Sequence, residues 1–70
     1  MRVLLKSLEE LEEEFTIVED DYYLIIDGLY VLDEMIDLLG KVHIAEYEEE
    51  TDSYVINGWR FNPSFITVLA

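Results

Sequence analysis

The stretch that most constrains the fold reads S-Y-V-I-N-G-W-R-F-N, from residue 53 to residue 62. Asn57 and Gly58 lie between two short alternating runs, which is the strongest local signal for a β-hairpin. A two-residue type I′ turn needs positive φ at both central positions, and Asn and Gly tolerate that conformation. The turn therefore predicts the pairs Ile56–Trp59, Val55–Arg60, Tyr54–Phe61 and Ser53–Asn62.

This register gives the hairpin two unlike faces, because side chains alternate across a strand. A one-residue slip would mix the two faces, so the pattern specifies one pairing. We expect the apolar face to pack in the core and the other face to lie outside. The apolar face carries Tyr54, Ile56, Trp59 and Phe61, and the other carries Ser53, Val55, Arg60 and Asn62.

The length of the chain predicts one small domain, residues 1–70. A chain this short buries only about 60% of its unfolded surface. There is no cysteine to add a disulfide or a thiolate metal site. Large aromatic side chains compensate, so we interpret most of them as core residues; the alternative is a groove for a proline-rich peptide. The aromatic set is Tyr22, Tyr23, Tyr30, Tyr47, Tyr54 and Trp59.

Two short helices are predicted. Ser7 and Glu10 form a capping-box pattern, and an apolar stripe at helical spacing follows at Leu8, Leu11 and Phe15. The second helix ends where Gly40 would adopt positive φ. Its apolar stripe is Leu32, Met35, Ile36 and Leu39.

The remaining segments predict strands. Residues 3–5 and 66–69 should be the first and last strands, and residues 62–65 a turn or one turn of 3₁₀ helix. Residues 22–26 should be a strand that is buried on both faces and closed by a turn at Asp27 and Gly28. The segments 41–47, 53–56 and 59–61 should form an antiparallel meander.

These elements predict an α+β, mainly β fold. Our first choice is a small SH3-like, partly open antiparallel barrel of five to six short strands with two short helices, because a small twisted meander tends to curl and protect its edges. The second choice is an open α+β sheet with one helix face.

Three stretches together resemble a group of small, mostly uncharacterised proteins encoded by bacteriophages. They are K-S-L-E-E-L-E-E-E-F (6–15), M-I-D-L-L-G-K-V-H-I (35–44) and Y-V-I-N-G-W-R-F-N-P-S-F (54–65). In that group an acidic helix leads in, a Met-x-x-x-x-Gly-Lys turn starts a strand, and a Trp-x-Phe-x-Pro segment ends the barrel. The resemblance covers about half of the chain, and it implies an SH3-like barrel and a phage origin without any catalytic residue.

The charge is strongly unbalanced, with 17 acidic against 4 basic residues and a net charge of −13. Such a chain is a poor direct ligand for DNA, RNA or anionic membranes, which need basic patches. The expected partner is instead a host protein with a basic nucleic-acid-binding cleft. The apolar run near the N-terminus is too short for a signal peptide, so we expect a cytoplasmic location in the host cell.

The residues that could carry chemistry are few. His43 has no evident base or nucleophile beside it in the pattern, and a chain this small can hardly build a catalytic pocket, so we expect no enzymatic activity. The acidic runs 19–21 and 48–52 lack the ordered oxygen spacing and the glycine turn of a calcium loop. We therefore expect neither a dedicated metal site nor a cofactor.

Carboxylates three or four residues apart on a helix lie about 5–6 Å from each other, comparable to the spacing of phosphates along one DNA strand. The hypothesis is a non-enzymatic phage inhibitor that binds a host nucleic-acid-handling protein through an acidic, DNA-mimicking surface, as an anti-CRISPR, anti-restriction or transcription inhibitor. The alternative is a structural or adaptor SH3-like module that binds a peptide or another phage protein, with a charge that only keeps it soluble. Either protein could be a monomer or a small homo-oligomer. The candidate contact residues are Glu9, Glu12, Glu13, Asp20, Asp21, Asp33, Asp37, Glu48, Glu49, Glu50 and Asp52.

Overall fold

The computed structural model describes residues 1–69. Within this range the chain forms short strands joined by tight turns, two α-helices and one 3₁₀ helix. In chain order the elements are β1 (Arg2–Leu5), α1 (Leu8–Glu14), β2 (Val18–Glu19), β3 (Tyr23–Ile26), β4 (Leu29–Leu32), α2 (Asp33–Ile36), β5 (Val42–Ile44), β6 (Glu46–Glu48), β7 (Ser53–Ile56), β8 (Trp59–Phe61), η1 (Pro63–Phe65) and β9 (Ile66–Val68).

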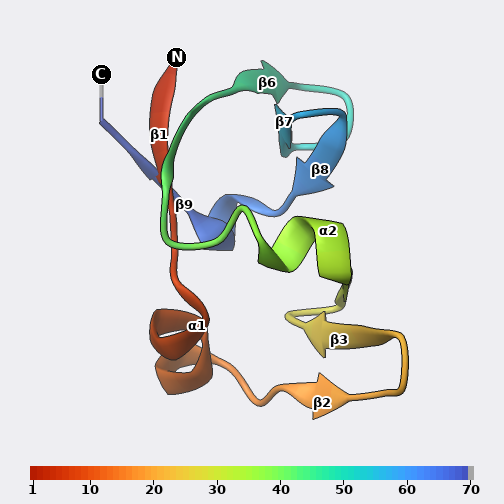
Figure 1. The fold of residues 1–70 in the computed structure, drawn as a ribbon. Helices are drawn as coiled ribbons and strands as arrows, with labels where there is room; N and C mark the ends of the chain where they lie inside the picture. Colours follow the sequence, from red (N-terminus) through yellow and green to blue (C-terminus); the bar gives the residue numbers. More distant parts are fainter. Residues whose placement is uncertain (70) are drawn as a thin grey trace.

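The strands pair into three antiparallel sheets, with the orders β5–β1–β9, β2–β3–β4 and β6–β7–β8. Figure 1 shows β1 and β9 side by side, β2 and β3 at the opposite end from β6–β8, and α2 between those two groups. The α+β, mainly β class is confirmed. A closed barrel is not formed by residues 1–69, and their nine strands exceed the five to six expected, because each ladder ends after two to four residues.

The hairpin at residues 53–61 is confirmed in its register. Ile56 pairs with Trp59, and the pairs Val55–Arg60 and Tyr54–Phe61 follow. Both turn residues, Asn57 and Gly58, have positive φ, at 51° and 83°. The apolar face packs on the core as expected, with Ile56 and Phe61 fully buried.

The outer end of this hairpin differs from the prediction. The ladder to β8 stops at Phe61, so the expected pair of Ser53 with Asn62 lies beyond it. Ser53 pairs with Glu48 of β6 instead. Its side chain is buried, and its hydroxyl donates a 3.1 Å hydrogen bond to the Thr51 carbonyl.

A second hairpin, β3–β4, was not predicted. Asp27 and Gly28 have φ of 50° and 76°, and they join strands in which Ile26 pairs with Leu29. This is the same turn chemistry as at residues 57 and 58. The turn at Asp27 and Gly28 is confirmed, and the strand over 29–32 that follows it is the unpredicted part.

The prediction that residues 22–26 are buried on both faces is wrong. Tyr22 lies outside β3 with 79% of its surface exposed, and within β3 only Ile26 is fully buried. The outer face of the hairpin is covered by its own side chains, since the rings of Tyr23 and Tyr30 stack with their centroids 5.0 Å apart. A small sheet at the edge of a small core has no second layer to bury that face.

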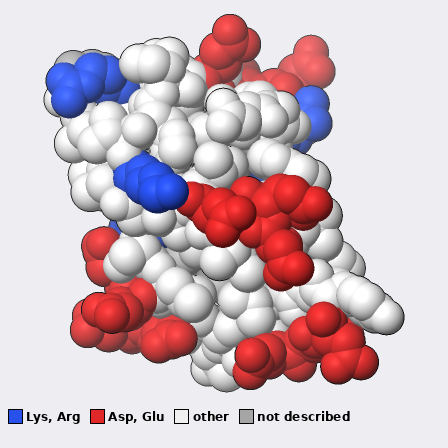
Figure 2. Space-filling view, in the orientation of Figure 1, with Lys and Arg blue, Asp and Glu red and all other residues white. Residues whose placement is uncertain are grey.

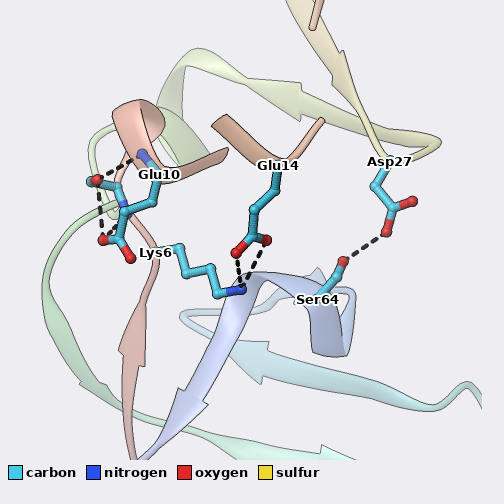
Figure 3. A network of polar contacts seen from close by, with 6 residues as sticks. Lys6, Glu10, Glu14, Asp27 and Ser64 are labelled. Carbon is cyan, nitrogen blue, oxygen red and sulfur yellow. Dashed lines mark hydrogen bonds and ion pairs between the residues drawn. The ribbon is translucent and has the colours of Figure 1, made fainter. Parts of the chain in front are cut away.

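The first helix is confirmed. The hydroxyl of Ser7 accepts a 3.2 Å hydrogen bond from the backbone N–H of Glu10, whose carboxylate in turn accepts from the Ser7 backbone (Figure 3). Leu11 is fully buried on the inner face of α1, and Leu8 and Phe15 pack beside it.

The second helix is shorter than the apolar stripe over 32–39 had predicted. It ends at Ile36, and residues 37–40 form turns. Leu32 at its start offers no side-chain cap, which leaves the first turn without that stabilisation. Gly40 has the expected positive φ of 76°, and its backbone N–H donates a 2.8 Å hydrogen bond to Leu5 of β1.

The predicted strand 41–47 is divided between two sheets. β5 pairs with β1, β6 pairs with β7, and the buried Ala45 lies between them. Consequently, only the β6 part joins the expected meander. Val42 and Ile44 are 51% and 72% exposed, whereas His43 is half-buried, with its Nε2 2.7 Å from the Leu38 carbonyl.

One core unites the three sheets. The sheet containing β1, the β3–β4 hairpin and the β7–β8 hairpin each contribute buried side chains. Polar contacts also join distant elements, since the Ser64 hydroxyl in η1 donates a 2.7 Å hydrogen bond to the carboxylate of Asp27 (Figure 3). The buried apolar residues of the described chain are Val3, Leu5, Leu11, Ile26, Val31, Met35, Ala45, Ile56, Phe61 and Phe65.

The β7–β8 turn offers a test of this fold. A Cβ at Gly58 would meet no atom within 4 Å, so Gly58→Ala changes only the backbone preference. We expect a loss of about 1–2 kcal/mol in the free energy of unfolding, measured by urea denaturation, because positive φ is strained for alanine. The control Asn57→Gly should cost less, since glycine adopts positive φ freely. Equal effects of the two changes would contradict the turn assignment.

Candidate functional site

The carboxylates dominate the surface. Sixteen of the 17 acidic residues are exposed, and the remaining one, Glu48, is half-buried. Every predicted contact residue on α1, in the β2–β3 turn and at the two ends of α2 is exposed to solvent. The fold therefore keeps this charge available to a partner.

Two ion pairs are present among residues 1–69. Lys6 Nζ lies 3.0 Å from both carboxylate oxygens of Glu14 (Figure 3). Arg60 uses Nε and Nη2 to bind the two oxygens of Glu48 at 3.3 and 3.1 Å. The other 15 acidic side chains have no ion pair within the part of the chain that is described.

Two groups near β6 have shifted pKa values. The hydrogen bonds from Arg60 and then from Thr51 hold the pKa of Glu48 below its ordinary value. The hydrogen bond from the hydroxyl of Tyr47 to Asp52, at 2.5 Å, raises the pKa of the tyrosine. These contacts order the 48–52 turn and engage two of its predicted contact residues, Glu48 and Asp52, within the protein.

The exposed carboxylates gather in groups. Figure 2 shows acidic surface over α1, around the β2–β3 turn, over α2 and near β6–β7, with uncharged surface between the first two. Of the predicted contact residues, Glu9, Glu12 and Glu13 lie on α1, Asp20 and Asp21 in the β2–β3 turn, Asp33 and Asp37 at the two ends of α2, and Glu48, Glu49, Glu50 and Asp52 in β6 and the β6–β7 turn.

Some of these groups surround a groove that runs between α1 and the β2–β3 hairpin. It consists of two adjoining hollows with volumes of about 430 and 320 Å³, which share Leu8, Glu19 and Leu24. Phe15 and Ile17 line only the first hollow, whereas Tyr22, Tyr23 and Ile36 line only the second. The larger volume is in the range of ligand-binding clefts, about 300–1,000 Å³.

Four predicted contact residues line this groove, namely Glu12, Asp20, Asp21 and Asp33. The structure does not bring all candidate residues into one site, because the other seven line neither hollow: Glu9, Glu13, Asp37, Glu48, Glu49, Glu50 and Asp52. Sequence reasoning missed Glu19 and the apolar lining of the groove. Ile17 and Glu19 are two residues apart, so an extended segment places them on the same side, which was a weak signal. That this side lies next to α1 depends on tertiary structure.

The interpretation that most of the aromatic set is core is wrong. Tyr22, Tyr30 and Tyr47 are exposed, at 79%, 60% and 44%. Tyr23, Tyr54 and Trp59 are half-buried. The small core is filled by aliphatic side chains together with Phe61 and Phe65, so the larger polar-tipped rings lie at its margin.

Residues 1–69 contain no group of three or more His, Cys, Asp or Glu side chains placed to hold a metal ion. The ring of His43 is engaged with the Leu38 carbonyl, and because a carbonyl only accepts, Nε2 carries the proton. None of the helices in this range has the length and apolar character needed to cross a membrane.

Comparison with known proteins gives no match: no family model, no curated protein and no solved structure is similar to this chain.

The crowding of charge on α1 gives one prediction. Glu13 lies one helical turn from Glu9, and such like-charge pairs cost about 0.2–0.5 kcal/mol. Glu13→Gln should therefore raise the free energy of unfolding by that amount at low salt, and the gain should vanish near 0.5 M NaCl. The control Glu14→Gln removes a similar pair but also the ion pair with Lys6, so it should give no gain. A gain that persists in high salt would contradict the electrostatic explanation.

The ion pair between Arg60 and Glu48 gives a second prediction. The pKa of Glu48 is lowered in the folded state, so the pair stabilises the protein at pH values above the ordinary pKa of 4.5. This stabilisation is lost as the pH falls through the lowered pKa. In Arg60→Gln the pKa of Glu48 should rise toward its ordinary value, as measured by an NMR titration of the side-chain carboxyl. An unchanged titration midpoint would show that Arg60 does not hold this carboxylate.

Proposed function

We propose that this chain is a non-enzymatic, phage-encoded inhibitor that binds a host nucleic-acid-handling protein by presenting carboxylates in place of DNA phosphates. The target class is a CRISPR, restriction or transcription protein with a basic cleft. The observation that carries the proposal is the surface of 16 exposed acidic residues, nearly all of them without an ion pair in the described chain.

The dimensions of the molecule support this proposal. Its longest axis is 33 Å, close to one turn of B-DNA at about 34–36 Å. Acidic groups lie toward both ends of the molecule, over α1 and the β2–β3 turn at one end and near β6–β7 at the other (Figure 2). A cleft that follows DNA over one turn would therefore meet carboxylates along its length.

The phage origin and the location in the host cytoplasm belong to the same proposal. They rest on the likeness of the three sequence stretches to small phage proteins. The SH3-like assignment belongs to it as well, and the β6–β7–β8 meander followed by β9 is the part of the fold that supports it. Steering by charge would give fast association that weakens with salt.

The rival function is an adaptor module that binds a peptide or another phage protein, with charge serving only solubility. Its support is the apolar lining of the groove and the exposure of Tyr22 and Tyr30. The two functions differ in their dependence on salt and in competition with DNA.

The test uses the full chain, immobilised and exposed to a bacterial extract at low salt. We expect it to capture a nucleic-acid-handling protein that duplex DNA displaces, and raising the salt from about 50 to 200 mM should weaken capture by tenfold or more. Glu12→Gln/Glu13→Gln should weaken capture more than the equally charged control Glu34→Gln/Glu46→Gln, which changes exposed residues outside the predicted contact set. A partner that withstands high salt and ignores DNA would overturn the proposal.

A further inference from the structure

The groove between α1 and the β2–β3 hairpin has an apolar floor. Leu8, Phe15, Ile17, Leu24 and Ile36 line it, and each of them is half-buried, packed against the core on one side. Because the two hollows share Leu8 and Leu24, the floor is continuous. Several half-buried apolar side chains gathered in one place are typical of an interaction site, whereas single exposed apolar residues scattered over a surface are not.

The rim of the same groove is acidic on both sides. Glu12 of α1 stands on one side, with Glu19, Asp20 and Asp21 on the β2–β3 side and Asp33 at the start of α2. Figure 2 shows the two acidic groups with uncharged surface between them. Both Lys6 and Arg60 are engaged in ion pairs elsewhere, and neither lines the hollows.

We propose that this groove binds a basic amphipathic segment of the partner protein, with apolar side chains on the floor and Lys or Arg side chains at the rim. The inference rests on the proposed function, because it names the part of the basic partner that is held. An amphipathic helix places apolar side chains on one face and cations beside them, which matches a narrow apolar floor between two acidic edges. Tyr22, 79% exposed at the second hollow, adds a ring that a cation can approach.

Charge argues against other occupants. DNA, RNA and anionic lipid would meet carboxylates on both sides of the floor. A second copy docked through the same groove would set rim against rim, which places like charges opposite each other. Arg2 and Lys41, the two cations without an ion pair in the described chain, do not line either hollow and do not relieve this repulsion.

The test uses two synthetic peptides with the same lysine content. One carries leucine at helical positions i, i+3, i+4 and i+7, and the other carries serine there. Fluorescence anisotropy at physiological salt measures their affinity for the full chain. We expect the leucine peptide to bind about tenfold tighter or more, because burying even one leucine side chain is worth that factor. Equal affinity of the two peptides would overturn the inference.

Matched variants locate the binding. Thr16 is exposed and lines the first hollow, so Thr16→Arg places a cation and its bulk in the groove without disturbing the core. Thr67→Arg makes the same change on β9, outside both hollows. Thr16→Arg should weaken the leucine peptide about tenfold, and Thr67→Arg by less than about threefold. Similar effects of the two variants would overturn the inference.

The two proposals fail separately. If the leucine and serine peptides bind equally while duplex DNA still displaces the captured host protein, the groove inference is wrong and the DNA-mimic function stands. If the leucine peptide binds as expected but the captured protein resists salt and DNA, the groove is a peptide site and the DNA-mimic function is wrong.

Discussion

The structure depends on one shared core that must overcome strong electrostatic repulsion. Each of the three sheets has strands of two to four residues, and isolated sheets of this size are at best marginally stable. They persist because Val3 and Leu5, the β3–β4 hairpin and the β7–β8 hairpin bury side chains against one another. A net charge of −13 acts against this compact state, so the chain places its carboxylates outside, where water and salt reduce their repulsion.

This arrangement links stability to binding. Like-charge neighbours on α1 destabilise the helix, and the capping box at Ser7 and Glu10 offsets part of that cost. The same carboxylates remain free because few cations are available to pair with them. A basic partner would relieve the repulsion that the free protein carries, so binding and stabilisation should occur together. The apolar floor beside α1 would add specificity that charge alone does not provide.

Much of the fold could be predicted from local rules. The β7–β8 register, the capping box and the positive φ of Gly40 follow from turn and cap chemistry, which acts over a few residues. The same turn rule applied at Asp27 would also have found β4. The predictions were wrong where long-range packing decides the bounds of a strand or helix. The segment 41–47 has one alternating pattern, yet β1 and β7 each pair with a part of it. The second helix ends at Ile36, and the turns after it bring Gly40 to Leu5 of β1.

The candidate site divides in the same way. The sequence by itself determined that the surface would be acidic, that α1 would present Glu9, Glu12 and Glu13 outward, and that a hairpin would turn at Asn57 and Gly58, because these features depend on composition and local periodicity. Tertiary structure alone decided that Ile17 and Leu24 face α1 across an acidic-rimmed groove, and that the 48–52 turn lies apart from it. Those relations depend on how three sheets share one core, and no local pattern encodes the direction in which each sheet packs.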